Sequence, residues 1–137
     1  MAFRIFLDTD VLLDFALKKD RTARQLMEWA VKGRVQAFIT SSHLPVIGYW
    51  LDKAYGPEKG KELLSALLVD IQVIDSGHEI ALNALHSQIG NMELALKYYT
   101  ALHHKLDYFI TGDKDLSQAA IPVLPACTPE EFIQNNR

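Results

Sequence analysis

The sequence predicts an α/β fold of the Rossmann-like type, a three-layer α/β/α arrangement in which a central parallel sheet lies between helices. Short, continuously apolar runs alternate along the chain with longer stretches whose apolar residues recur at helical spacing. The short runs are typical of parallel strands buried on both faces, and the longer stretches are typical of the helices that connect them. No internal repeat or linker interrupts the 137 residues, so one domain spanning residues 1–137 is expected.

Residues 4–7 form the first expected strand, because apolar residues follow one another there. Helical spacing begins after Asp10 and ends near Lys19, whose positive charge suits a helix C-terminus. Asp20 then caps a second helix, and Gly33 ends it as a glycine after a helix commonly does. The chain therefore starts with one strand followed by two helices.

The next part of the chain is expected to form a strand over residues 36–39, helices over residues 43–53 and 57–68, and a strand over residues 71–74. The first of these helices is apolar on nearly every side, which indicates that it is buried in the core or against a partner. We expect this helix to make the protein a homodimer, or to be covered by another protein. Its apolar side chains are Leu44, Val46, Ile47, Tyr49, Trp50 and Leu51.

The last part of the chain continues the alternation of helices and strands. Helices are expected over residues 77–85 and 91–102, and Asn91 caps the second of them. A short helix follows Asp115, and a terminal helix begins at Thr128 with the residue pattern of a capping box. The remaining strands are expected over residues 108–110 and 122–124.

The composition argues against several classes of protein. The net charge of −3 does not suit a protein that holds nucleic acid through bulk positive charge, but it allows a nuclease with a local basic rim. Cys127 is the only cysteine, so neither a disulfide framework nor a thiolate zinc site is available. The sequence has no apolar run of membrane-spanning length and no leader-like start, so we expect a cytoplasmic protein without membrane contact.

Two of the expected strands end in acidic residues. Asp8 follows the first strand directly, and Asp113 follows the strand over residues 108–110. Because the carboxyl ends of parallel strands lie at one edge of a sheet, these two carboxylates converge if their strands are neighbours. Converging carboxylates favour a hard cation such as Mg²⁺ or Mn²⁺, which supports phosphodiester hydrolysis. A helix-capping role would explain Asp8 without any chemistry, and Asp115 is expected to be a solvated acid of the next helix.

Three motifs, in this order, resemble the PIN domain family. They are Asp-Thr-Asp-Val-Leu-Leu-Asp at residues 8–14, Tyr-Phe-Ile-Thr-Gly-Asp at residues 108–113 and Thr-Pro-Glu-Glu-Phe at residues 128–132. The resemblance implies a Rossmann-like sheet and Mg²⁺- or Mn²⁺-dependent cleavage of RNA. Many small bacterial members are toxins, so it also implies an antitoxin protein as partner. Its catalytic and metal-binding acids carry over to Asp8 and Asp113.

The chain departs from the PIN pattern at two acidic positions. Val46 stands where the family usually has an acid in the third helix, and Leu94 stands where it usually has an aspartate. Glu93 is one residue away, and it is either a third metal-binding and catalytic residue or a surface glutamate paired with Lys97. Asp10 is expected to be a cap or a partner of the site. With two acids missing, the sequence predicts weak binding of Mg²⁺ or Mn²⁺ and weakened or lost RNA cleavage.

Two other functions stay open at this point. The segment at Asp8 is also similar to the opening motif of the haloacid-dehalogenase-like phosphatases, with Asp8 as nucleophile and Asp10 as acid/base. Thr40 or Ser41 would then bind the phosphate. Ser117 stands where that family has a further acid, and no cap insertion is present. The other alternative is a non-catalytic binding module on a PIN scaffold, which the two missing acids favour.

Overall fold

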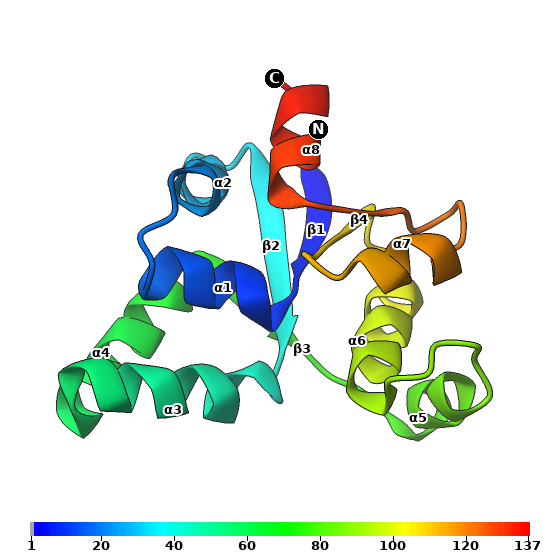
Figure 1. Cartoon of the computed structure of the whole chain (residues 1–137), viewed down its shortest axis with the longest axis horizontal. Helices are drawn as coiled ribbons and strands as arrows, with labels where there is room; N and C mark the ends of the chain where they lie inside the picture. Colours follow the sequence, from blue (N-terminus) through cyan, green and yellow to red (C-terminus); the bar gives the residue numbers. More distant parts are fainter. Residues whose placement is uncertain (1) are drawn as a thin grey trace.

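The computed structural model describes residues 2–137, which form a central parallel sheet between two layers of helices (Figure 1). The sheet has five strands in the order β3-β2-β1-β4-β5, and every neighbouring pair is parallel. Strand β1 (Phe3–Leu7) lies at its centre, between β2 (Val35–Thr40) and β4 (Tyr108–Ile110). The edge strands are β3 (Ile71–Ile74) and β5 (Ala126–Cys127). The predicted α/β fold is confirmed.

One face of the sheet is covered by helices from the first half of the chain and by the C-terminal helix. These are α1 (Thr9–Ala16), α2 (Arg21–Val31), α3 (His43–Tyr55), α4 (Pro57–Leu67) and α8 (Pro129–Asn135). Their apolar side chains pack on strand residues that point to this face, since successive side chains of a strand alternate between faces. The buried strand residues concerned are Ile5, Leu7, Val35, Ala37, Ile39, Ile71 and Ile110.

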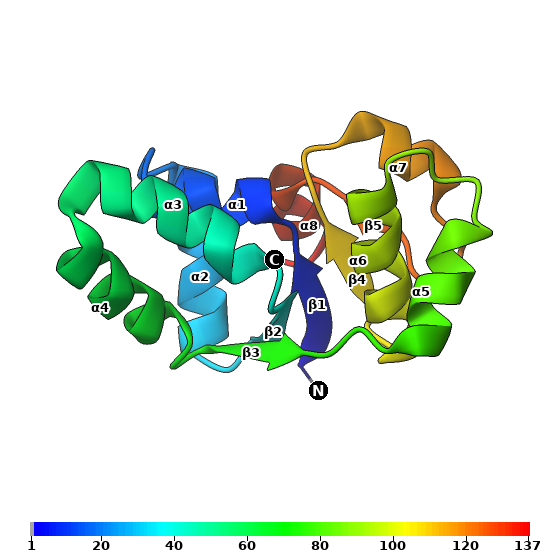
Figure 2. The same ribbon diagram turned by 90° about the horizontal axis from the view of Figure 1, so that it is seen from below.

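The opposite face is covered by α6 (Met92–His103) and α7 (Lys114–Ala119), and α5 (His78–Leu85) packs against α6 (Figure 2). The core on this side is built around aromatic rings. Phe6 and Phe109, which are partners in the register of β1 and β4, stack with a centroid distance of 4.8 Å. Tyr98 of α6 packs among these rings, and its hydroxyl donates to the carbonyl of Leu124, so its polar end is satisfied. The other members of this core are Phe38, Ala101, Leu106 and Leu116.

The predicted caps begin and end several helices. The side chain of Asp20 accepts from the backbone N–H of Ala23 at the start of α2, and Asn91 caps α6 in the same way. Thr128 and Glu131 form the predicted capping box of α8. Gly33 follows α2 with a φ of 76°, a left-handed conformation that glycine adopts without strain.

The strand predicted over residues 122–124 is wrong. These residues form a turn in which the N–H of Leu124 donates to the carbonyl of Ile121. The fifth strand is β5, a little later in the chain, where the carbonyl of Pro125 accepts from the N–H of Phe109. Of these residues only Leu124 is buried, among the aromatic core, and Val123 is 70% exposed.

Helix α3 is apolar on nearly every side, but the core covers only one of its faces. His43, Ile47 and Leu51 are fully buried on that face. An apolar face of the same helix is exposed to solvent, with Tyr49 53% and Trp50 45% exposed. The exposed rings pack edge to face against each other. Within residues 2–137, no helix is long and apolar enough to cross a membrane.

Candidate functional site

The two acids predicted to converge lie at the same edge of the sheet, because β1 and β4 are parallel neighbours. Asp8 follows β1, and its N–H donates to the carbonyl of Ile110, the last residue of β4. The hydroxyl of Thr111 donates to Asp8 Oδ2 at 2.7 Å and accepts from the N–H of Asp113 at 3.1 Å. A single threonine side chain therefore connects Asp8 with the residue that begins α7.

The carboxylate of Asp8 is buried, and protein groups satisfy both of its oxygens. The residue is only 8% exposed. Besides the hydroxyl of Thr111, it accepts from the N–H of Thr9 at 2.8 Å as the cap of α1. Asp8 Oδ1 also accepts from Lys97 Nζ at 3.3 Å. A buried carboxylate is stable only when it is paired and hydrogen-bonded in this way.

The sequence indicated Lys97 only as a partner of Glu93, and its contact with Asp8 was missed. Its side chain is 5% exposed, and its ammonium donates to three oxygens. These oxygens belong to Asp8, to the hydroxyl of Thr9 at 2.9 Å and to Glu93 at 3.0 Å. The signal in the sequence was weak: Lys97 lies three and four positions before Thr100 and Ala101, which are both buried on α6. Lys97 thus continues a buried stripe rather than a solvated face.

Glu93 makes the pair with Lys97 that was one of its two predicted roles, at the spacing of one helical turn. Its side chain is 64% exposed, so Glu93 lies at the rim of the site while Asp8 lies at its base. Leu94 is half-buried beside it, and Val46 is 37% exposed on α3. Neither apolar side chain can supply an oxygen ligand.

The remaining acids hold backbone groups. Asp113 Oδ1 accepts from the N–H groups of Asp115 and Leu116 and so caps α7, while Asp115 is exposed in the first turn as predicted. Asp10 accepts from the N–H groups of Val11 and Gly112. A Cβ at position 112 would lie 2.6 Å from Asp10 Oδ2, so a larger residue there would force the Asp10 side chain to shift. Partial loss of water and the nearby charge of Asp8 raise the pKa of the Asp10 carboxyl.

His43 is a buried, uncharged histidine beside the site. The backbone N–H of Thr40 donates to His43 Nδ1, so the proton lies on Nε2, which donates to the carbonyl of Leu7 at 2.8 Å. Burial, followed by the positive charge of Lys97, lowers the pKa of His43 to about 4. Of the two predicted phosphate ligands, Thr40 already bonds to Ser42 and His43 through its hydroxyl, whereas Ser41 is exposed.

The residues at this edge do not assemble a site for a divalent metal ion. In the part of the chain that the structure describes, no three His, Cys, Asp or Glu side chains are placed to hold one ion together. Asp8 accepts three hydrogen bonds from protein donors, and Asp113 caps a helix. Metal binding by Asp8, Asp113 and Glu93 therefore stays a prediction that their arrangement does not favour.

Comparison with known proteins agrees with the motifs and the sheet. The family described as PIN domain matches residues 4–115 of the chain. The chain belongs to the PIN domain family. Among curated proteins, none matches it significantly. This PIN domain therefore has its acidic edge where the family motifs predicted it, with Lys97 inside that edge.

Solved structures share the fold of this PIN domain. VapBC2 from Rickettsia felis, bound to a DNA fragment of its promoter, is 17% identical with a TM-score of 0.72, covering 92% of this chain and 98% of that one. A toxin–antitoxin complex from Klebsiella pneumoniae is 23% identical with a TM-score of 0.69, covering 91% and 97%. DNA-bound VapBC from Salmonella typhimurium is 15% identical with a TM-score of 0.68, covering 93% and 98%. At such identities the likeness supports the fold alone.

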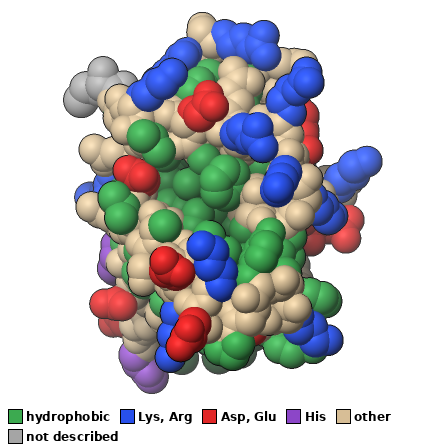
Figure 3. Space-filling view, turned by 90° about the vertical axis from the view of Figure 1, so that its left-hand side faces the viewer, with side chains coloured by type: hydrophobic (Ala, Val, Ile, Leu, Met, Phe, Trp, Pro, Cys, Tyr) green, Lys and Arg blue, Asp and Glu red, His purple; other side chains and the backbone are tan. Residues whose placement is uncertain are grey.

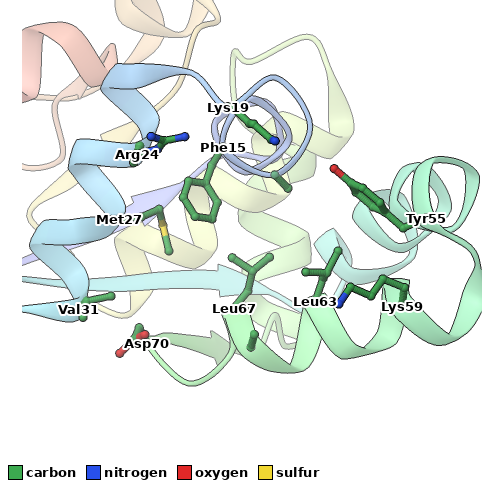
Figure 4. A pocket seen from close by; sticks show the side chains of 12 residues that line it. Phe15, Lys19, Arg24, Met27, Val31, Tyr55, Lys59, Leu63, Leu67 and Asp70 are labelled. Atoms are coloured by element: carbon green, nitrogen blue, oxygen red, sulfur yellow. The ribbon is translucent and has the colours of Figure 1, made fainter.

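A second feature of this PIN domain is an apolar groove of about 580 Å³ between α1, α2 and α4. None of its lining residues belongs to the acidic edge. Its floor contains Phe15, Met27 and Leu67, whose side chains point toward one another in Figure 4. On this side of the molecule, Figure 3 shows apolar side chains at the centre, Lys and Arg side chains mainly above and to the right of them, and acidic side chains to the left and below. The charged residues that line the groove are Lys19, Arg24, Lys59 and Asp70.

Proposed function

We propose that this protein is a toxin-type PIN domain that binds an antitoxin protein through its apolar groove and has weakened or lost RNA cleavage. The groove is the observation that carries the proposal. It combines an apolar floor with three basic side chains at its margin, and exposed apolar surface of this kind marks a site of protein association. The similarity to structures titled VapBC and toxin–antitoxin complex supports the same class of partner.

The groove indicates the chemistry of the bound segment. Phe15, Met27 and Leu67 come from three different helices and leave an apolar channel between them. A helix with one apolar face is a common occupant of such a channel. Acidic residues beside that face would complement Lys19 and Arg24, since opposite charges across an interface favour the correct partner. We therefore expect an amphipathic, acidic segment of the antitoxin in the groove.

Weak cleavage of RNA is the second candidate function. Asp8 and Asp113 keep the positions that the family motifs assign to catalytic acids, at one edge of the sheet. Two observations weigh against efficient cleavage. Asp8 is paired with Lys97, and apolar side chains occupy positions 46 and 94. These acids and Glu93 stay the candidate catalytic residues if an RNA substrate is cleaved.

Partner binding can be tested with the protein encoded by the neighbouring reading frame. Co-purification and calorimetry of the two proteins are expected to show a stable complex. Leu63→Glu places a charge in the groove and is expected to abolish the complex, whereas Leu82→Glu, at an exposed site on α5, is the matched control. A complex that survives Leu63→Glu unchanged would show that the groove is not the binding site. RNA cleavage with Mn²⁺ is expected to be slow or absent for the wild type, and any cleavage that is seen is expected to disappear in Asp8→Asn.

A further inference from the structure

We propose that Lys97 is a built-in cation that takes the place of a divalent metal ion at the acidic edge, and that the edge binds no such ion while Lys97 is present. The proposal deepens the proposed function, because it gives the physical reason for weakened or lost cleavage. It depends on the contacts, burial and charge of one side chain.

The contacts of Lys97 are those of a cation in an oxygen cage. An ammonium group has three N–H donors and no acceptor, and each donor of Lys97 has a different oxygen within 3.3 Å. Asp8 and Thr9 supply two of these oxygens from the junction of β1 and α1, and Glu93 supplies the third from α6. Carboxylate and hydroxyl oxygens are also the atoms that Mg²⁺ and Mn²⁺ select. The ammonium therefore uses the oxygens that a metal ion would need.

Burial prevents Lys97 from leaving these oxygens easily. The residue is 4% exposed, so its ammonium cannot reach water without displacing the groups packed around its stem. A divalent ion bound to Asp8 would then lie beside a positive charge from which little water screens it. Asp113 can compensate only with its Oδ2, because its Oδ1 accepts both bonds that cap α7. Entry of a metal ion thus requires the loss of Lys97 from the site.

Lys97 offsets part of the negative charge at this edge without a metal, and Asp10 and Asp113 add to that charge. Asp8 and Glu93 contribute two negative charges, and Lys97 offsets one of them inside the site. The second charge is at Glu93, whose side chain is 64% exposed and therefore hydrated. A neutral residue at position 97 would leave both carboxylates without this cation. The variant Lys97→Met, with an unbranched side chain of similar length, is therefore expected to open the site.

The experiment measures Mn²⁺ binding by the electron paramagnetic resonance signal of the free ion, with thermal unfolding as a second readout. The wild type, Asp8→Asn and the exposed-lysine control Lys61→Met are each expected not to reduce the signal of free Mn²⁺. Adding Mn²⁺ is expected to leave the melting temperature of each of these proteins unchanged. Lys97→Met is expected to reduce the free-ion signal and to melt at a higher temperature with Mn²⁺ than without it. Both effects are expected to disappear in the double variant Asp8→Asn with Lys97→Met.

Mn²⁺ retained by the wild type and lost on Asp8→Asn would overturn the proposal, and so would a folded Lys97→Met that retains none. The wild-type and Asp8→Asn titrations decide the matter even where Lys97→Met fails to fold. Binding of the antitoxin through the groove is measured separately, by complex formation with Leu63→Glu as the disrupting variant. Mn²⁺ binding thus tests the role of Lys97, and complex formation tests the proposed function, so a negative result for one is distinguishable from a negative result for the other.

Discussion

The buried pair of Asp8 and Lys97 leads us to predict a large loss of unfolding free energy when Lys97 alone is replaced. The two side chains are 11% and 5% exposed, so Lys97→Met leaves a carboxylate largely out of water and without its cation. Removal of one partner of a buried ion pair typically costs about 3–5 kcal/mol. Asp8 keeps its bonds from Thr9 and Thr111, which places the expected loss near the lower end, about 3 kcal/mol of unfolding free energy.

Asp8→Asn is expected to destabilise less, on the order of 1–2 kcal/mol, because Lys97 keeps Thr9 and the hydrated Glu93 as partners. The double variant removes both charges, and its stability is expected within about 1 kcal/mol of the wild type. Replacing the pair together is thus predicted to be better tolerated than replacing Lys97 alone. This non-additivity is the signature of a direct interaction.

Urea unfolding followed by far-ultraviolet circular dichroism measures these free energies for all four proteins, with Lys61→Met as the exposed control. A total stability of about 5–15 kcal/mol is usual for a domain, so a loss of about 3 kcal/mol is easily resolved. A free energy of unfolding for Lys97→Met within about 0.5 kcal/mol of the wild-type value would refute the reasoning, because that is the usual effect of a surface substitution.

Two further predictions concern His43 and helix α3. The folded pKa of His43, about 4, lies below its ordinary value of 6.5, so the unfolded state takes up a proton first as the pH falls. Stability is therefore full above about pH 6.5 and falls by on the order of 3 kcal/mol toward pH 4, and His43→Gln should flatten this slope in urea titrations. Self-association through the exposed rings of α3 predicts a dimer in sedimentation at micromolar concentration that Trp50→Glu makes monomeric; a monomeric wild type would contradict it.

Much of the fold could be predicted because the deciding signals are local. Apolar runs marked β1, β2, β3 and β4, and the caps Asp20, Asn91 and Thr128 marked the starts of helices. The error at residues 122–124 has a local origin as well. Only Leu124 of this apolar run is buried, and its burial involves no strand pairing. Pairing with β4 begins at Ala126, which the local sequence does not indicate.

The candidate site could be predicted only in part. Two acids after parallel strands pointed to one edge, and β1 and β4 are indeed neighbours. The buried contact of Lys97 with Asp8 was not predicted, because a lysine four positions after a glutamate is typical of a solvated helix face. Its partner Asp8 lies 89 positions away in the sequence, so only the packing of α6 on the sheet reveals the pair. The groove could not be predicted either, because its floor is formed by the packing of three helices.

Crystals of the wild-type protein grown with Mn²⁺ test the central claim most directly, through an anomalous difference map at the manganese absorption edge. We predict Lys97 Nζ within hydrogen-bond distance of Asp8, Thr9 and Glu93, and no anomalous peak among these residues. An anomalous peak bound by Asp8 and Asp113, with Lys97 turned away from them, would contradict the account.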